Sequence, residues 1–229
     1  EYIKELDFPG NAPRTREEAI MLLNAPDCPA GETTIILDGG QTALQVHESC
    51  GHPVELDRVL GSELSYAGGS FLTLEKYGKF RYGSKSVNIT ADASLAGGAG
   101  SFAYDDEGIK AQRVELVKNG IFSDYLTSRE TASLLKKESN GAMRAESWNN
   151  IPLIRMTNVN LEPGKESLEE LIADTRNGLY LCTNKSWSID DLRLNFQFGA
   201  EIAWQIKNGR LRNACKNPVY YSNTPYFWN

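Results

Sequence analysis

The sequence has few of the residues that build small metal-binding or disulfide-bonded frameworks. Its 229 residues include only four cysteines, which lie far apart and form no Cys-x-x-Cys pair. This spacing excludes a zinc ribbon and argues against a disulfide framework, so we expect a reducing, cytoplasmic setting. The cysteines are Cys28, Cys50, Cys182 and Cys215.

Long apolar runs and clustered positive charge are also missing. No run approaches the roughly 18 apolar residues that a membrane-spanning helix needs. Lysine and arginine number 24 against 30 acidic residues, which gives a formal net charge of -6 without a basic stripe. We therefore expect neither a membrane nor a nucleic-acid partner. No signal peptide is visible, and the chain begins at Glu1 without a methionine.

The order of strand and helix signals predicts an α+β fold. Residues 1–32 are expected to form an approach segment with one helix from Arg16 to about Leu23, which starts at a capping box of Thr15 and Glu18. Strands are predicted at residues 33–37 and 87–90. Two hairpins are predicted around the Asn-Gly pairs at 119–120 and 208–209, because this dipeptide suits a type I′ turn.

Separate helices are predicted between these strands. One spans about residues 129–137, and another starts at a Ser167–Glu170 capping box and ends at Gly178. A further helix carries His47 to His52. We therefore predict mainly antiparallel strands, in a sandwich or open barrel, with a few separate helices.

The segment VHESCGHPVELD, residues 46–57, carries the clearest chemical signal. The chain's only two histidines, His47 and His52, lie within six residues, with Glu48 between them. His-Glu-x-x-x-His resembles the zinc-peptidase motif His-Glu-x-x-His with one extra residue. In the shorter motif two histidines on one helix face hold zinc, and the glutamate acts as general base on the metal-bound water.

The extra residue raises a geometric problem. Positions i and i+5 of a regular helix are roughly 140° apart, so the two rings would not face the same ion. Either a π-turn realigns them, or the helix ends near Gly51 and His52 approaches from a non-helical position. Pro53 favours the second alternative, because a residue before proline is pushed away from α geometry.

A third protein ligand is not evident from spacing. A catalytic zinc usually has three protein ligands, and the histidines supply two. Cys50 lies between them and would have to reach back to the same ion, so we do not expect it to bind. The other candidates, which spacing does not support, are Glu55, Asp57, Cys182 and Cys215.

The stretch HESCGHPVELDRVLG, which begins at His47, resembles the HExxxH signature of TldD, the metallopeptidase subunit of the TldD/PmbA family (also called modulators of DNA gyrase). The partner subunit, PmbA or TldE, lacks HExxxH, so the motif indicates the TldD side. Four more stretches, which follow the family's order within about residues 33–225, resemble the family: SFAYDDEGIKAQRVELVKNGIFSDYLTSRETA (101–132), GAMRAES (141–147), RMTNVNLEPG (155–164) and IKNGRLRNACKNPVY (206–220).

This resemblance implies a zinc-dependent peptidase that cleaves unfolded or extended peptides, with His47 and His52 as zinc ligands and Glu48 as general base. It implies assembly with a PmbA/TldE-like partner, or a homodimer in its place. In the family the third zinc ligand is a cysteine in a later Gly-Thr-Cys-Gly-like segment, and this sequence contains no such segment.

We therefore expect residues 33–229 to be a TldD-like core that is truncated at both ends relative to the family. Zinc is then expected to be absent or weakly bound in this chain, and the chain alone to be inactive. The alternative function is a non-catalytic subunit that binds a partner or a peptide and has an incomplete metal site.

Overall fold

The computed structural model describes residues 2–229, which form two compact units. Of the described residues, the first unit comprises 2–41, 166–186 and 198–220, and the second comprises 42–165, 187–197 and 221–229. The fold is α+β, with open and mostly antiparallel sheets, as the sequence predicts. Within residues 2–229, no helix combines the length and the apolar character that crossing a membrane requires.

The N-terminal helices of the first unit start earlier than predicted. Helix α1 spans Tyr2–Glu5, and α2 spans Phe8–Asn24. The cap of α2 is Asp7, whose carboxylate accepts from the backbone N–H of Gly10, whereas Thr15 donates to a carbonyl inside the helix. The predicted Thr15–Glu18 capping box is therefore wrong. Pro9 lies in the first turn of α2, which tolerates proline because the N–H groups there have no partner within the helix.

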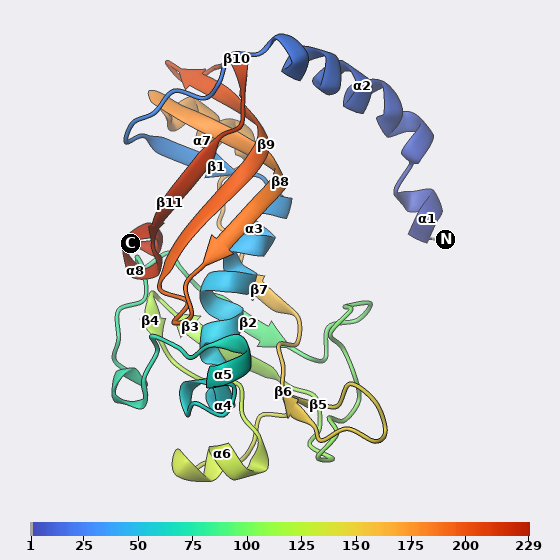
Figure 1. Ribbon diagram of the computed structural model, residues 1–229, viewed down its shortest axis with the longest axis vertical. Helices are drawn as coiled ribbons and strands as arrows, with labels where there is room; N and C mark the ends of the chain where they lie inside the picture. Colours follow the sequence, from blue (N-terminus) through green and yellow to red (C-terminus); the bar gives the residue numbers. More distant parts are fainter. Residues whose placement is uncertain (1) are drawn as a thin grey trace. The chain divides into compact units, whose positions relative to one another are not determined.

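A five-stranded sheet follows the order β1-β8-β9-β10, with β11 also paired to β9 (Figure 1). Strand β1 pairs in parallel with β8, and β10 pairs antiparallel with β9. The predicted turn between β9 and β10 is confirmed, because Asn208 and Gly209 both have positive φ, at 52° and 71°. The strands are β1 (Thr34–Leu37), β8 (Asn177–Ile189), β9 (Asn195–Lys207), β10 (Leu211–Lys216) and β11 (Val219–Asn223).

Helix α7 (Leu168–Asp174) belongs to the first unit and confirms the second predicted capping box. Ser167 accepts from the N–H of Glu170, and the Glu170 carboxylate accepts from the N–H of Ser167. The helix ends at Asp174, short of the predicted Gly178, because residues 177 onward pair as β8. The core of this unit includes Leu179, Leu181, Ala200, Ala203 and Cys215.

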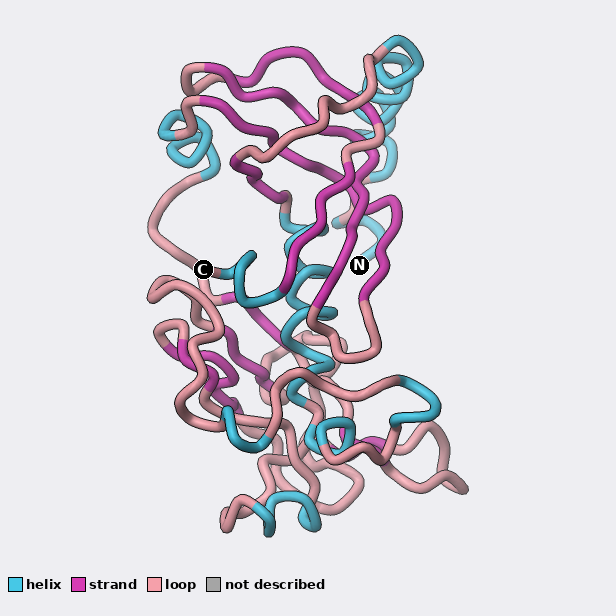
Figure 2. The backbone as a smooth tube through the Cα atoms, turned by 60° about the vertical axis from the view of Figure 1, so that its left-hand side comes forward, coloured by secondary structure: helices cyan, strands magenta, loops and turns pink. Residues whose placement is uncertain are grey.

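The second unit contains an antiparallel sheet in the order β4-β3-β2-β7 and a two-stranded β5–β6 pair. Long loops connect these short strands (Figure 2). The predicted Asn-Gly turn between β3 and β4 is confirmed, with φ of 49° at Asn119 and 74° at Gly120. The strands are β2 (Ile89–Asp92), β3 (Arg113–Lys118), β4 (Ile121–Phe122), β5 (Met143–Arg144), β6 (Leu153–Ile154) and β7 (Val159–Leu161).

Short helices complete the second unit: α4 (Leu56–Val59), α5 (Leu64–Ala67), the 3₁₀ turn η3 (Leu74–Lys76), α6 (Arg129–Leu134) and α8 (Thr224–Trp228). Helix α6 is the predicted helix at 129–137, three residues shorter at its end. Its Ser128 cap accepts from the N–H of Thr131.

The core of the second unit packs directly against the HExxxH segment. Tyr82, which is fully buried, donates its hydroxyl to the carbonyl of Ser49 at 2.7 Å. Trp228 donates its indole N–H to the Ser49 hydroxyl at 3.0 Å, and Cys50 lies in the same core. Full burial of a large aliphatic side chain or of phenylalanine stabilises a fold by ~1.5–3 kcal/mol, and Leu56, Leu72 and Phe122 are fully buried in this core. The residues inside the motif therefore anchor the helix, which leaves the residues on its other side available for chemistry.

Candidate metal centre

The HExxxH segment is one continuous helix with a π-turn in its middle. Helix α3 (Gly39–Val46) continues as the π-helical segment η1 (His47–Gly51) and then as the 3₁₀ turn η2 (His52–Val54). The backbone N–H of His52 donates to the carbonyl of His47, which is an i→i+5 bond. This bond places the two histidines one turn apart, as a π-turn does when it inserts one residue into a helix.

His52 is helical, with φ -66° and ψ -41°. The favoured alternative from the sequence, a non-helical His52, is therefore wrong. The rule that a residue before proline avoids α geometry is a preference rather than a prohibition. Pro53 occupies the start of the 3₁₀ turn, where a missing N–H costs little.

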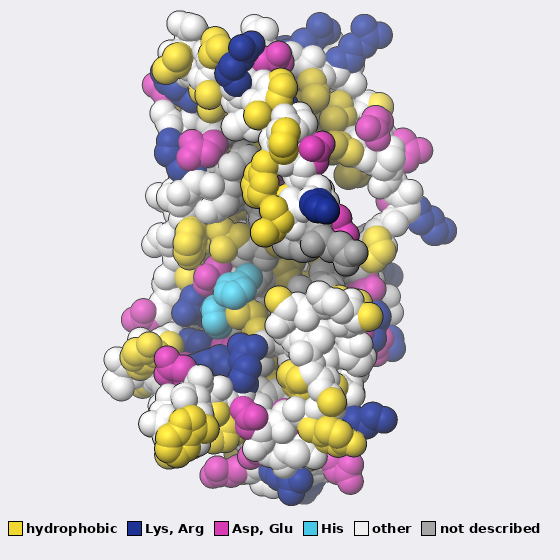
Figure 3. Space-filling model, turned by 90° about the vertical axis from the view of Figure 1, so that its right-hand side faces the viewer, with side chains coloured by type: hydrophobic (Ala, Val, Ile, Leu, Met, Phe, Trp, Pro, Cys, Tyr) yellow, Lys and Arg dark blue, Asp and Glu magenta, His cyan; other side chains and the backbone are white. Residues whose placement is uncertain are grey.

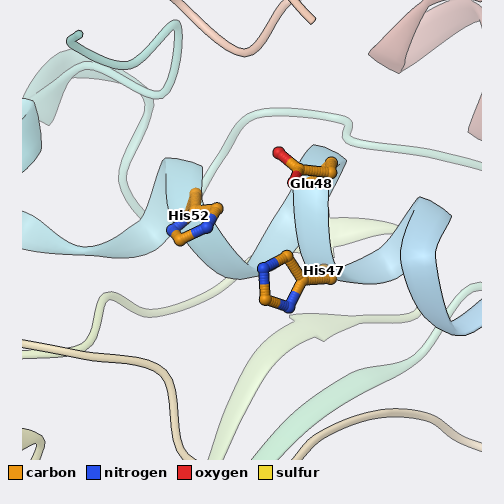
Figure 4. Close-up of side chains that lie close together, drawn as sticks. All are labelled: His47, Glu48 and His52. Carbon is orange, nitrogen blue, oxygen red and sulfur yellow. The ribbon is translucent and has the colours of Figure 1, made fainter. Parts of the chain in front are cut away.

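The π-turn brings the three predicted side chains together (Figure 4). His47 and Glu48 project from one turn of the ribbon, and His52 projects from the next. The imidazole centroids are 4.7 Å apart with the rings edge to face at 89°. One nitrogen of each ring and one Glu48 carboxylate oxygen all lie within 4.8 Å of one another. Within residues 2–229, no other group of three such side chains is this close.

Two imidazoles and a carboxylate are ligands that zinc takes in proteins. Zinc–nitrogen bonds are about 2.0–2.1 Å long, so two nitrogens on one ion are separated by about 4 Å or less, and the three ligand atoms here lie within 4.8 Å of one another. His47 is exposed and His52 is half-buried, whereas Glu48 is buried beside them. The two rings meet solvent on one face of the molecule (Figure 3). An ion can therefore reach the rings from solvent.

Glu55 orients the His52 ring from behind. A Glu55 carboxylate oxygen lies 3.0 Å from His52 Nδ1, and Glu55 is fully buried. When Nδ1 carries the proton and donates to this carboxylate, Nε2 is left as the metal-binding atom. Carboxylates commonly fix the ring orientation of a metal-ligating histidine in this way. If His52 binds a metal ion through Nε2, Glu55 would hold the ring in place rather than bind the ion itself.

Burial and neighbouring charges have opposite effects on the pKa of Glu55. Burial alone would raise its pKa, but the hydrogen bond to His52 and the charges of His52 and Arg58 outweigh burial and lower the pKa. Arg58 donates to the same oxygen through Nε at 3.1 Å and Nη2 at 2.8 Å, and the other oxygen accepts from the Met156 N–H. The carboxylate is thus ionised and fully hydrogen-bonded.

The pKa of His47 is lowered as well, but for this group a lower pKa favours the neutral form. Burial of part of the ring and the neighbouring His52 lower the pKa of His47, although Glu48 and Glu55 raise it in part. A lowered pKa favours the neutral imidazole, which is the form that binds a metal.

Glu48 lies beside the histidines but is held by an arginine. Arg193 Nη1 donates to Glu48 Oε2 at 2.6 Å, and both side chains are largely buried. One carboxylate oxygen is therefore engaged, and the carboxylate as a whole is adjacent to both imidazoles.

The cysteines are not part of this group. Cys50 is fully buried in the core, and burial raises the pKa of its thiol to about 12, which disfavours the thiolate that binds zinc. Asp57 accepts from the backbone N–H groups of Arg58 and Ile154, and burial raises its pKa to about 6. Cys182 and Cys215 belong to the first unit, where burial raises the thiol pKa to about 11 and about 12.

A groove of about 520 Å³ opens in the same unit. Tyr66 lines it, and the adjacent Ala67 carbonyl accepts from both Arg58 and Arg193, which hold Glu55 and Glu48. Arg155 also lines the groove, but Glu63 pairs with it at 2.7 Å. Figure 3 shows Lys and Arg side chains gathered beside the two histidines.

Sequence reasoning missed Arg58 and Arg193. Arg58 lies only six residues after His52, and this closeness in sequence was the signal that could have found it. Arg193 is 145 positions from Glu48, and no local pattern in a single sequence connects the two.

The chain is similar to known proteins over most of its length. Residues 30–229 match the family described as PmbA/TldA metallopeptidase C-terminal domain. A metalloprotease of Methanocaldococcus jannaschii is 37% identical over 202 residues, which cover 88% of this chain and 43% of that protein. A zinc metalloprotease TldD homolog of Saccharolobus solfataricus is 29% identical over 196 residues, covering 85% of this chain and 42% of that protein.

A solved structure has the same fold. TldE from Thermococcus kodakarensis aligns with a TM-score of 0.80 at 19% identity, covering 97% of this chain and 49% of that chain. The chain thus spans about half the length of the relatives it matches. The match of residues 30–229 to the family, together with 37% identity to an archaeal metalloprotease, shows that this chain belongs to the PmbA/TldD family of metallopeptidases.

Proposed function

We propose that this chain is the zinc-binding core of a peptidase that cleaves unfolded or extended peptides. The observation that carries the proposal is the π-turn, which sets His47 and His52 side by side with Glu48 adjacent. A chance pair of histidines would not need a helix irregularity at the one place that aligns them. The names of the metalloprotease relatives support the same activity.

Each residue has a distinct role in this proposal. His47 and His52 hold the ion through one nitrogen each, and Glu55 fixes the His52 ring through Nδ1. A bound zinc ion supplies Lewis acidity, which lowers the pKa of coordinated water towards ~7 and polarises a carbonyl. Glu48 accepts the proton of the attacking water and later passes it to the leaving amine, as a general base and acid do. The core around Ser49 and Cys50 excludes water from the other side of the helix.

The proposed partner rests on the resemblance, and the proposed substrate rests on the resemblance and on the groove lined by Tyr66 and Arg155. We propose a peptide substrate, a PmbA/TldE-like partner subunit or a homodimer in its place, and no nucleic-acid or membrane partner. The fold shared with TldE supports a partner of related architecture. The four free thiols support a cytoplasmic location.

The second candidate is a non-catalytic subunit that binds a partner or peptide. One observation favours it: within residues 2–229 the metal-binding group consists of only two histidines and Glu48. Zinc content of the complete protein separates the two candidates, because a catalytic site usually has three protein ligands.

Replacement of the general base is the direct test of the mechanism. In the complete protein, Glu48→Gln should retain zinc but lose peptide cleavage by about 10²–10⁴-fold, because proton transfer is lost while both histidines remain. Metal analysis and a peptide-cleavage assay measure this. Glu130→Gln, on the exposed face of α6, is the matched control and should be fully active. Full activity of Glu48→Gln would remove Glu48 from the mechanism.

Glu55 should matter for zinc affinity. Glu55→Gln removes the charge that orients the His52 ring, and loss of such a partner typically weakens metal binding about 10–100-fold. Competition with a chelator measures the affinity, and thermal unfolding of the metal-free protein reports any loss of folding. Glu115→Gln changes an exposed carboxylate paired with Lys118 and should bind zinc normally. An unchanged affinity in Glu55→Gln would mean that His52 needs no support from Glu55.

Assembly can be measured independently of activity. The complete protein should be at least dimeric in solution, alone or with its partner subunit, because a stable interface buries ~1,000 Å² or more in total. Light scattering gives the mass. A fully active monomer would contradict the proposed assembly.

A further inference from the structure

Arg193 reaches the proposed general base from a distant part of the chain. It lies in the connection between β8 and β9, at residues 190–194, and its Nη1 donates to Glu48 Oε2 at 2.6 Å. The Arg193 side chain is 17% exposed and that of Glu48 is 9% exposed. Charge-assisted hydrogen bonds of this length between an arginine and a carboxylate are among the stronger ones in proteins.

Hydrogen bonds from two other segments hold the connection that carries Arg193, one segment at residues 69–71 and the other at Thr224. The backbone N–H of Gly69 donates to the carbonyl of Asp191 at 2.8 Å, and that of Phe71 donates to Leu192 at 2.8 Å. The hydroxyl of Thr224 donates to the Arg193 carbonyl at 3.1 Å. At Gly68 the backbone approaches so closely that an added Cβ would lie 2.4 Å from the Asp191 carbonyl oxygen. Arg193 is thus presented by a fixed loop rather than by a mobile one.

Two features of Arg193 in this position are energetically unfavourable. Arg193 has φ 61°, a left-handed conformation that is disfavoured for a residue with a Cβ. Its Nε is buried and has no hydrogen-bond partner among residues 2–229, and an unmade hydrogen bond of a buried donor is unfavourable. Strain of this kind persists where the surroundings enforce it and concentrates at functional sites.

Arg193, which holds Glu48, shares a hydrogen-bond acceptor with Arg58, which holds Glu55 next to His52. Arg193 Nη2 donates to the carbonyl of Ala67 at 3.4 Å, and Arg58 Nη1 donates to the same carbonyl at 2.5 Å. Arg58 in turn holds Glu55, which orients His52. The Ala67 carbonyl thus contacts both arginines: Arg193, which binds Glu48, and Arg58, which binds Glu55.

We propose that Arg193 is the positioning residue for Glu48. It occupies one carboxylate oxygen and fixes the side-chain rotamer, so that the other oxygen is free to take the proton of the attacking water. A glutamate without this contact would sample several rotamers, and small displacements of a catalytic group reduce the rate strongly. The inference rests on the proposed peptidase function and adds to it a residue that the HExxxH motif does not include.

Steady-state kinetics of the complete protein with bound zinc test this role. Arg193→Met should lower kcat by about 10–100-fold, because a 1 Å misplacement costs up to about 10²-fold, while KM stays within a few-fold. Arg193→Lys should recover part of kcat, since a lysine keeps one charged donor. Zinc content should be unchanged in both variants. Arg113→Met removes an exposed arginine that pairs with Glu162 and should leave kcat unchanged.

A second measurement does not depend on activity. Thermal unfolding of the metal-free protein, compared for Glu48→Gln, Arg193→Met and the double variant, should give shifts in Tm that are not additive, because the two residues contact each other. Additive shifts would show that the ion pair does not form in solution.

The outcomes separate the two hypotheses. Cleavage by the unaltered protein with an unchanged kcat in Arg193→Met would refute the positioning role alone. A higher kcat in Arg193→Met would mean that Arg193 restrains Glu48 in an inactive position, which would refute the proposal. Loss of zinc together with kcat in this variant would mean that Arg193 acts on metal binding, which would also refute it. No zinc-dependent cleavage by the unaltered protein would instead refute the proposed function.

Discussion

The site depends on one backbone hydrogen bond, from the N–H of His52 to the carbonyl of His47. In a regular helix the histidines of an HExxxH sequence would point in different directions. The i→i+5 bond accommodates the extra residue in a wider turn, so that the His52 side chain projects from the same face of the helix as His47. The three residues between Glu48 and His52 can then face the core, where Ser49 and Cys50 are anchored by Tyr82 and Trp228.

Buried charges form a second layer behind this helix. Glu55 and Glu63 pair with Arg58, and Glu63 also pairs with Arg155. Loss of one partner from a buried ion pair typically costs about 3–5 kcal/mol, whereas an apolar replacement of the whole pair is often neutral or stabilising. The network is therefore an inefficient way to gain stability. In the proposed site, its contact with His52 and that of Arg193 with Glu48 would orient the side chains that act on the substrate.

Local sequence patterns predicted the local features well. The Asn-Gly turns and the Ser167–Glu170 box each depend on a few adjacent residues, and the structure confirms them. HExxxH identified the three side chains that come together, because motif residues share one helix. The strand at 87–90 was displaced by two residues relative to β2, since short strands have weak boundaries. The division at residue 33 between an approach segment and a core stays a prediction.

Two local features were predicted wrongly, and one tertiary contact was beyond a single sequence. The helical state of His52 was predicted wrongly because the local preference before Pro53 was outweighed by the continuous helix. The start of α2 was misplaced because Asp7 was not recognised as a cap. The contact of Arg193 with Glu48 joins positions 145 residues apart, and only folding of the β8–β9 connection over the motif reveals it.

X-ray absorption at the zinc edge, on the complete protein supplied with zinc, tests the central claim most directly. The account predicts a single ion bonded to one nitrogen of His47 and one of His52 at about 2.0–2.1 Å, with loss of the corresponding scattering in His47→Ala and His52→Ala. An ion whose coordination is the same in both variants, or no bound zinc at all, would contradict it.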